Sequence, residues 1–252
     1  MAILNEIVGY CNELLSINSF QDYCPNGLQV EGASSVKTIV SGVTASQALV
    51  DAAVKAQADL LLVHHGYFWK GEALVLTGLR RQRIKTLLCN NISLLAYHLP
   101  LDAHSTLGNN ACLAQLLGLQ QQGVFGYGGG PEIACYGELS DVSTVTQLTK
   151  KISQAVNREP LVISSGPEKI SRIGWCTGAA QSYIEAAADL GLDAFISGEI
   201  SEQTVHVARE CGIHYFAAGH HATERFGVQA LGKQLAGQFA VDHQYIEIEN
   251  PV

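Results

Sequence analysis

KTIVSGVTASQALVDAAVKAQADLLLVHHG, residues 37–66, is the stretch that decides the fold. It contains a short apolar run, a glycine turn, an alanine-rich helical pattern and a second apolar run. Apolar strands that alternate with helices of this length are typical of α/β proteins with parallel strand pairing. We therefore expect strands near Thr38–Val43 and Leu60–Val63, with a helix over Ser46–Gln57 between them.

The same pattern returns in SRIGWCTGAAQSYIEAAADLGLDAFISGE, residues 171–199. Each copy is followed by a helix and another apolar strand, in NISLLAYHLPLDAH (91–104) and GIHYFAAGHHATE (212–224). Both place a histidine after that strand and an acid four positions later, His98 with Asp102 and His220 with Glu224. This weak internal repeat predicts two similar α/β domains with mixed sheets flanked by helices. Chance likeness between short stretches is the alternative interpretation.

Further apolar runs and helical patterns complete the expected architecture. We expect strands near Ile92–Tyr97, Ile133–Leu139, Arg172–Thr177, Ala194–Ser197, Ile213–Ala217 and His243–Ile248. We expect helices over Met1–Leu15, Leu79–Asn90, Asp141–Val156 with Ser140 as N-cap, Gln181–Leu190, Glu202–Cys211 and Ala222–Leu235. The glycine-rich stretch Gly126–Pro131 is the expected hinge, which gives domains at 1–124 and 125–252.

Composition excludes several classes of protein. With 252 residues, 47% of them hydrophobic, the chain can bury a large core. The net charge of -8 and the absence of basic runs argue against nucleic acid as a partner, although an ion could still attract a small anionic substrate. Seven cysteines without a CxxC pair fit scattered buried thiols in a reducing cytoplasm. We see neither a signal peptide nor a membrane span, and expect a cytoplasmic protein.

Two adjacent histidines, His64 and His65, directly follow the strand predicted at Leu60–Val63. Adjacent strand residues point to opposite faces, but Gly66 lets the backbone turn so that both imidazoles reach one cavity. There they would serve two ions more easily than chelate one. Histidine and carboxylate without cysteine form the ligand sets of hydrolytic zinc, manganese, iron or nickel sites. We interpret the doublet as metal ligands; a hydrogen bond to the turn is the alternative.

The next segment, YHLPLDAH, offers an anionic ligand in Asp102. Pro100 ends the preceding strand, and a turn or helix N-cap is the alternative role for Asp102. His98 and His104 flank this aspartate. We expect them to contact substrate or to orient a ligand rather than to bind an ion directly.

The third segment is AAGHHATERFG. His220 and Glu224 share one helix face if the helix has begun by His220. Glu224 could then bridge two cations with its two oxygens, while His221 points elsewhere. For Thr223 and Arg225, contact with substrate and a plain position on the helix surface are equally good interpretations.

Glu199 follows the strand that the repeat equates with the one before His64 and His65. It is either a base close to the ligands or an acid favoured by a helix N-terminus. The nearly complete P-loop around Gly232 and Lys233 reads as continuous helix and is dismissed.

At these segments the sequence resembles the Nif-three-like family, in its short bacterial YbgI-like form, often labelled GTP cyclohydrolase 1 type 2 homologues. HHGYFW, YHLPLDAH, SGEISEQ and GHHATERFG follow the family order, and the match covers essentially the whole chain. The resemblance implies two α/β domains and a ring-shaped homohexamer with metal sites facing an internal cavity. It also implies a dinuclear centre at His64, His65, Asp102, His220 and Glu224.

The leading functional hypothesis is a hydrolase that uses two divalent ions, zinc, manganese, iron or nickel, on a small molecule. If the substrate is the nucleotide GTP, water would attack C8, open the imidazole ring and release formate. His98, His104 or Glu199 would move protons. A metal-binding scaffold or carrier without turnover is the second hypothesis. A ring that encircles DNA is the third, and the acidic balance opposes it.

Overall fold

The computed structural model describes residues 1–128 and 132–252. The chain forms two compact units, and each is described by itself. The first unit contains Met1–Leu101 and Gly227–Glu249, and the second contains Asp102–Phe226 and Asn250–Val252. The mixed α/β class expected from the sequence is confirmed.

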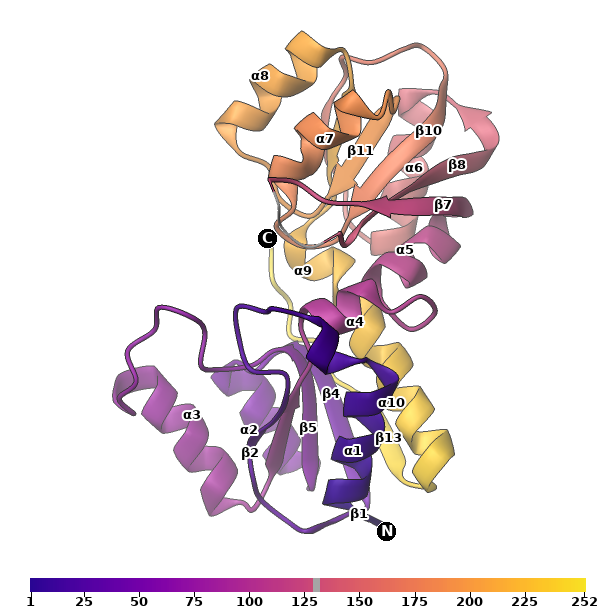
Figure 1. The fold of residues 1–252 in the computed structure, drawn as a ribbon. Helices are drawn as coiled ribbons and strands as arrows, with labels where there is room; N and C mark the ends of the chain where they lie inside the picture. The colour runs from indigo at the N-terminus through magenta and orange to yellow at the C-terminus, as the bar shows by residue number, and fades with distance from the viewer. Residues whose placement is uncertain (129–131) are drawn as a thin grey trace. The chain divides into compact units, whose positions relative to one another are not determined.

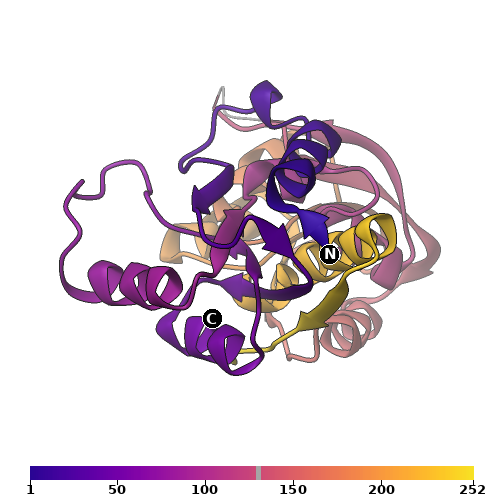
Figure 2. The same cartoon turned by 90° about the horizontal axis from the view of Figure 1, so that it is seen from below.

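The first unit is built on a five-stranded sheet in the order β13-β4-β5-β6-β2. Its three central neighbours, β4, β5 and β6, are parallel, β13 pairs parallel with β4, and β2 pairs antiparallel with β6. Figure 2 shows the yellow β13 beside the purple strands of this sheet. The strands are β2 (Gly27–Val30), β4 (Thr38–Thr44), β5 (Leu60–His65), β6 (Ser93–Ala96) and β13 (Asp242–Tyr245). A separate two-stranded pair joins β1 (Ala2–Ile3) to β3 (Ser35–Val36).

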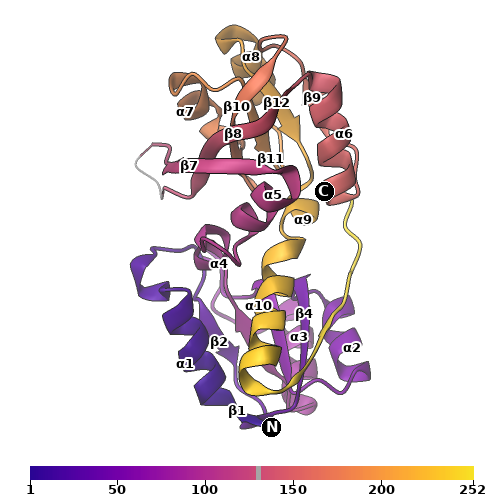
Figure 3. The same cartoon turned by 90° about the vertical axis from the view of Figure 1, so that its right-hand side faces the viewer.

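Helices cover both faces of this sheet, as Figure 1 shows. On one face, α2 (Gln47–Lys55) and α3 (Gly78–Cys89) pack with the strands around buried Leu49, Leu61 and Leu87. On the other, α1 (Leu4–Leu14) and α10 (Arg225–Phe239) lie side by side (Figure 3). Tyr10 of α1 meets Phe239 of α10 edge to face, with ring centroids 5.5 Å apart.

The second unit has a six-stranded sheet in the order β7-β8-β10-β11-β12-β9. Again three central strands, β10, β11 and β12, are parallel, and an antiparallel strand, β9, pairs with the third of them. The strands are β7 (Leu119–Phe125), β8 (Ala134–Ser143), β9 (Leu161–Ile163), β10 (Ile170–Cys176), β11 (Ala194–Ser197) and β12 (His214–Ala217). The helices are α5 (Asn109–Leu117), α6 (Val145–Val156), α7 (Ile184–Asp189), α8 (Glu202–Cys211) and α9 (His220–Thr223), and α4 (Leu99–Ala103) carries the chain in from the first unit.

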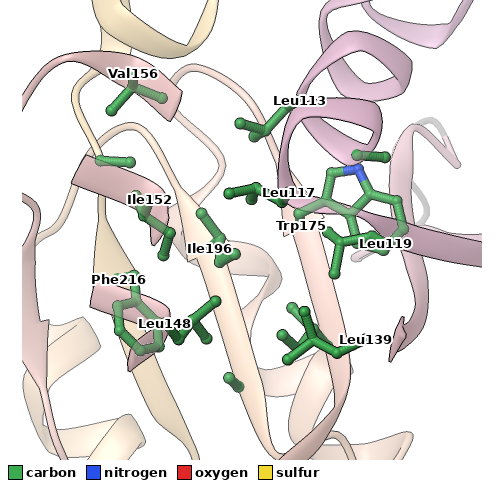
Figure 4. Packing of buried hydrophobic residues seen from close by; sticks show 14 of the residues in the cluster. Leu113, Leu117, Leu119, Leu139, Leu148, Ile152, Val156, Trp175, Ile196 and Phe216 are labelled. Atoms are coloured by element: carbon green, nitrogen blue, oxygen red, sulfur yellow. The ribbon is translucent and has the colours of Figure 1, made fainter. Parts of the chain in front are cut away.

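The core of the second unit lies between its sheet and the pair α5 and α6. Figure 4 shows Trp175 of β10 facing Leu113 and Leu117 of α5, while Leu148 and Ile152 of α6 pack near the neighbouring strands. Trp175 is fully buried, and its indole N–H donates to the carbonyl of Asn110 at 3.0 Å. This packing holds the carboxyl ends of β10, β11 and β12 in a fixed arrangement.

The two units repeat one arrangement, as the sequence predicted. In each unit an aspartate accepts two backbone N–H groups from a neighbouring strand. The aspartate comes just before β5 or β11, and the N–H groups lie at the start of β4 or β10. Asp59 accepts from Lys37 and Thr38 at 2.7 and 2.9 Å. Asp193 accepts from Ser171 and Arg172, both at 2.8 Å. The matching bonds and strand order show that the likeness extends to the fold.

The unit boundaries differ from the predicted 1–124 and 125–252. The chain leaves the first unit after Leu101 and returns to it at Gly227, because α10 packs there and β13 pairs with β4. In the predicted hinge Gly126–Pro131, Gly129, Gly130 and Pro131 lie outside the described residues. The strands on either side, β7 and β8, pair antiparallel in one sheet.

Two local expectations are wrong. The helix expected over Asp141–Val156 begins at Val145, because β8 continues to Ser143 and Thr144 is the N-cap. Thr144 and Gln147 form a capping box, which satisfies the first backbone N–H groups of the helix.

The cysteines are free but not all buried, since Cys89 and Cys211 are exposed. Within residues 1–128 and 132–252, no helix has both the length and the apolar character needed to span a bilayer.

Candidate metal-binding site

In the first unit, the carboxyl end of β5 carries the predicted histidine doublet. His64 is buried, and its Nδ1 donates to the carbonyl of Tyr97 at 2.8 Å. Because a carbonyl oxygen only accepts, the proton lies on Nδ1 and a neutral His64 carries its lone pair on Nε2. Nδ1 of His65 lies 3.1 Å from the Thr44 hydroxyl, and the two imidazole centroids are 4.6 Å apart. The strand end therefore brings both rings together.

His98, which follows β6, joins this doublet. One ring nitrogen each of His64, His65 and His98 lies within 4.8 Å of the others. Nδ1 of His98 donates to Asp22 at 2.7 Å. Burial would raise the pKa of Asp22, but the His98 hydrogen bond and charge, with bonds from Asn26 and Tyr23, hold this pKa below its usual range. Asp22 lies in the loop before β2, where no sequence motif marks it.

In the second unit, Asp102 and Glu224 bring two carboxylates together. Both are buried, with 5% and 2% of their surface exposed, and an oxygen of each lies within 4.8 Å of the other. Oδ1 of Asp102 accepts from the Asn109 amide at 2.8 Å and from the Thr177 hydroxyl at 3.3 Å. Two buried anions at this separation repel each other unless a proton or a cation compensates them.

His220 connects this carboxylate pair to Glu199. Its Nδ1 donates to Glu199 at 2.7 Å, and its Nε2 lies 3.1 Å from Oε2 of Glu224. The expected i,i+4 contact exists because α9 begins at His220. Burial lowers the pKa of His220, but hydrogen bonds and charges from Glu224 and Glu199 outweigh it and raise the pKa to about 9. A carboxylate on Nδ1 is the usual way to orient a metal-binding imidazole.

Glycines at three strand ends let these groups approach one another. Gly178, Gly198 and Gly219 follow β10, β11 and β12, and their backbones are linked in series. Gly198 N–H donates to the Gly178 carbonyl and Gly219 N–H to the Gly198 carbonyl, both at 2.9 Å. A Cβ on Gly178 would stand 2.1 Å from Oε1 of Glu224, and the φ of Gly178 is +71°. No local pattern in the sequence indicates this role for glycine.

The other candidate residues have different surroundings. Nδ1 of His104 accepts the backbone N–H of Leu107 at 3.1 Å, so the proton of a neutral His104 lies on Nε2. Burial lowers the pKa of His104. His104 and Asp102 line a cavity of about 170 Å³ within the second unit. His104 is thus a hydrogen-bond donor beside a predicted ligand.

Thr223 and Arg225 hold the backbone in place. The Thr223 hydroxyl accepts the Gly178 N–H at 3.1 Å, and Arg225 donates to the Val156 carbonyl at 2.5 Å. This supports a structural interpretation of both residues over a contact with substrate.

The chain is similar to known proteins over nearly its whole length. Residues 2–251 match the family model of Duf34/NIF3 (NGG1p interacting factor 3). The GTP cyclohydrolase 1 type 2 homolog of Pseudomonas aeruginosa is 54% identical over the full length of both chains. The Escherichia coli protein of the same name is 51% identical and covers 98% of each chain.

Solved structures show the same likeness. A structure described as "protein ybgI, unknown function" has a TM-score of 0.96 and 50% identity over 100% of both chains. TTHA1606 from Thermus thermophilus has a TM-score of 0.88 and 32% identity, also with full coverage.

Proposed function

The chain belongs to the Duf34/NIF3 family, and on this premise we propose that it is a metal-dependent hydrolase with two divalent ions at His64, His65, Asp102, His220 and Glu224. The observation that carries the proposal is the pair of buried carboxylates, Asp102 and Glu224, with His220 beside them. Cations bound there would remove the repulsion between the two anions.

The donor chemistry of both units fits a divalent ion. His64 and His220 each have Nδ1 engaged by an oxygen acceptor, which directs Nε2 toward a ligand. Asp102 and Glu224 supply oxygen. A set of imidazole and carboxylate without thiolate is used by hydrolytic zinc, manganese, iron and nickel sites.

Two of the proposed ligands lie close in sequence to the positions where the chain passes from one unit to the other. Asp102 is the first residue of the second unit and comes four positions after His98 of the first. Four residues span at most about 14 Å, even when fully extended. Glu224 comes three positions before Gly227, where the chain returns to the first unit. Two proposed ligands therefore flank the two crossings of the chain.

Divalent ions in such ligand sets acidify water and polarise the oxygen of a substrate. The residues of the chain would orient the reactants. Glu199 keeps His220 in one ring orientation, and His104 presents an N–H in the cavity that it shares with Asp102. His98 or Glu199 would move protons during hydrolysis. For GTP, the products would be formate and the ring-opened nucleotide.

Metal analysis combined with a substrate screen tests the proposal. We expect protein purified without chelator to retain two divalent ions per chain and to hydrolyse a nucleotide or phosphoester. His220→Ala and Glu224→Gln should each lose metal. The matched control is His206→Ala, because His206 forms an exposed i,i+4 pair with Glu202 at 2.7 Å.

Each negative result of these experiments would reject a different part of the proposal. If the protein binds no metal under any loading condition, the proposed site is rejected. Two retained ions without turnover of any nucleotide or phosphoester would reject the hydrolase and leave a metal-binding scaffold or carrier. We further propose a cytoplasmic homohexamer, and light scattering that gives another mass would reject that assembly.

A further inference from the structure

We propose that Asp22 is a positioning residue that fixes His98 with its proton on Nδ1, so that Nε2 of His98 accepts a hydrogen bond from the attacking water. This inference deepens the proposed hydrolase and rests on it for the identity of the water. The fixed orientation of His98 does not depend on metal binding.

The carboxylate of Asp22 is buried and held at both oxygens. Its side chain is 3% exposed. Oδ1 accepts from Nδ1 of His98 at 2.7 Å and from the backbone N–H of Tyr23 at 2.6 Å. Oδ2 accepts from the Asn26 amide at 2.8 Å and from the backbone N–H of Leu99 at 3.0 Å. A buried charge is costly unless it is bonded in this way, and here one of the four donors is an imidazole.

This arrangement decides which nitrogen of His98 accepts. An ionised carboxylate has no proton to donate, so Nδ1 of His98 must carry one. A neutral His98 then has its lone pair on Nε2. The ring is 14% exposed and lies between the aromatic groups of the first unit, with centroids 5.1 Å from His64, 5.7 Å from His65 and 5.0 Å from Trp69. An acceptor nitrogen thus sits next to two proposed metal ligands.

The second unit repeats this pairing at the equivalent position. His220 follows β12 as His98 follows β6, and each histidine donates from Nδ1 to a carboxylate at 2.7 Å. The carboxylates come from different places, Asp22 from a loop before β2 and Glu199 from the end of β11. Two unrelated positions supply the same contact, which argues that orienting the imidazole is what matters.

Nitrogen-15 NMR of histidine-labelled protein tests the inference. In metal-free protein we expect His98, assigned by comparison with His98→Gln, to show a protonated Nδ1 and a pyridine-type Nε2. In Asp22→Asn one oxygen becomes an NH₂ group. Two of the groups around it can switch from donor to acceptor, the His98 ring and the Asn26 amide. Asn26 is held in its present orientation because its Oδ1 accepts the backbone N–H of His98 at 2.8 Å, which leaves the His98 ring to switch. We therefore expect the proton to move to Nε2.

Loading with Zn²⁺ tests whether Nε2 of His98 stays available to water or binds the ion itself. Nε2 of His98 should keep its pyridine-type signal while ligand histidines shift. In turnover, Asp22→Asn should lower kcat by about 10²-fold, with KM and bound metal little changed.

Asn26→Ala is the matched control. It removes bonds of the same loop to Asp22 and to the His98 backbone, but keeps the carboxylate beside the ring. If the role of Asp22 were only to anchor the loop, both variants would lose the same thermal stability and leave the His98 tautomer unchanged. That result would overturn the inference. It would also be overturned if His98 of the wild-type protein carried its proton on Nε2, or if Nε2 of His98 showed the shift of a zinc-bound nitrogen. Protein that retains no metal would reject the hydrolase but would leave the metal-free NMR result standing.

Discussion

Gly178 lies directly against the carboxylate of Glu224, so that a Cβ at this glycine would stand 2.1 Å from Oε1. The backbone there has φ +71°, a region that side chains rarely adopt. The nearest atom belongs to the far end of a flexible side chain, so that Glu224 can move while the fold persists. Gly178 is therefore a point at which a single methyl group would displace a proposed ligand.

We predict that Gly178→Ala binds Zn²⁺ at least about tenfold more weakly than wild type, since Glu224 must turn away. Gly191→Ala is the control, because Gly191 has a similar φ of +65° and its nearest neighbour is 3.5 Å away. Both variants should lose about 1 kcal/mol of stability from the strained backbone. Isothermal titration with Zn²⁺ measures the difference, and equal affinities in the two variants would contradict the prediction.

Metal affinity should depend on pH through His220. Its pKa in the metal-free protein is about 9, so the ring carries a proton at neutral pH. Binding must displace that proton. Affinity should therefore rise by up to about tenfold per pH unit from pH 7 to 9 and then level off. Titrations in buffers of different ionisation enthalpy would show the released proton, and an affinity that is constant over this range would contradict the assignment.

His220 should also make the folding stability of the metal-free protein depend on pH, and this stability should fall as the pH rises while metal affinity increases. The folded pKa of His220 lies above the ordinary value of 6.5, so the charged form is stabilised by folding. In metal-free protein this contribution is fully present below pH 6.5 and is lost as the pH rises through about 9. Glu199→Gln should reduce this pH dependence in urea unfolding experiments, whereas Glu202→Gln, which removes an exposed histidine partner, should leave it unchanged.

The repeated aspartates should make comparable contributions to stability. Asp59 and Asp193 each accept two backbone N–H groups at the start of a strand. Replacing either with alanine leaves donors without their acceptor and should cost about 1–3 kcal/mol. Asp51→Ala is a control, since the exposed Asp51 accepts from a side chain, the Gln47 amide, and not from the backbone at the start of a strand. Urea unfolding checks the three variants, and no loss in either strand-start variant would contradict the prediction.

Two glycines of α10 should respond in opposite ways to alanine. A Cβ on Gly232 would stand 2.1 Å from the His243 ring, which is bonded to the Ser41 hydroxyl at 2.8 Å. Gly232→Ala should therefore destabilise the protein by about 1–3 kcal/mol. Gly237 has nothing within 4 Å of such a Cβ, and Gly237→Ala should stabilise the helix by about 0.5 kcal/mol. Thermal unfolding of both variants measures the contrast, and stabilisation by both would show that α10 does not pack closely on β13.

Strands and helices could be predicted from the sequence where a local pattern of residues determines them. The apolar runs at β5, β11 and β12 are short and each is followed within two residues by glycine, so their positions and the repeat could be predicted. The start of α6 was missed although Thr144 and Gln147 fit a capping box, because Ser140 is also a good N-cap.

Contacts distant in sequence could not be predicted from local patterns. Pairing of β13 with β4 depends on packing that no short window contains, and it moves the unit boundary. Asp22 contacts His98 across 76 positions, in a loop without regular periodicity. The Gly178 contact requires the geometry of three adjacent strand ends. The metal ligands remain a prediction, and they could be singled out because six of the nine histidines fall in three short segments, two of which also contain an acid.

The position of β13 at the far end of the chain has a consequence for synthesis on the ribosome. When residues up to Phe226 have emerged, β10, β11 and β12 have all been made, but β4 still presents an open edge. An open edge exposes unpaired backbone groups and invites pairing with other chains. The nascent protein therefore needs residues up to Tyr245 before β13 can cover the edge of β4, although most of that sheet was made first.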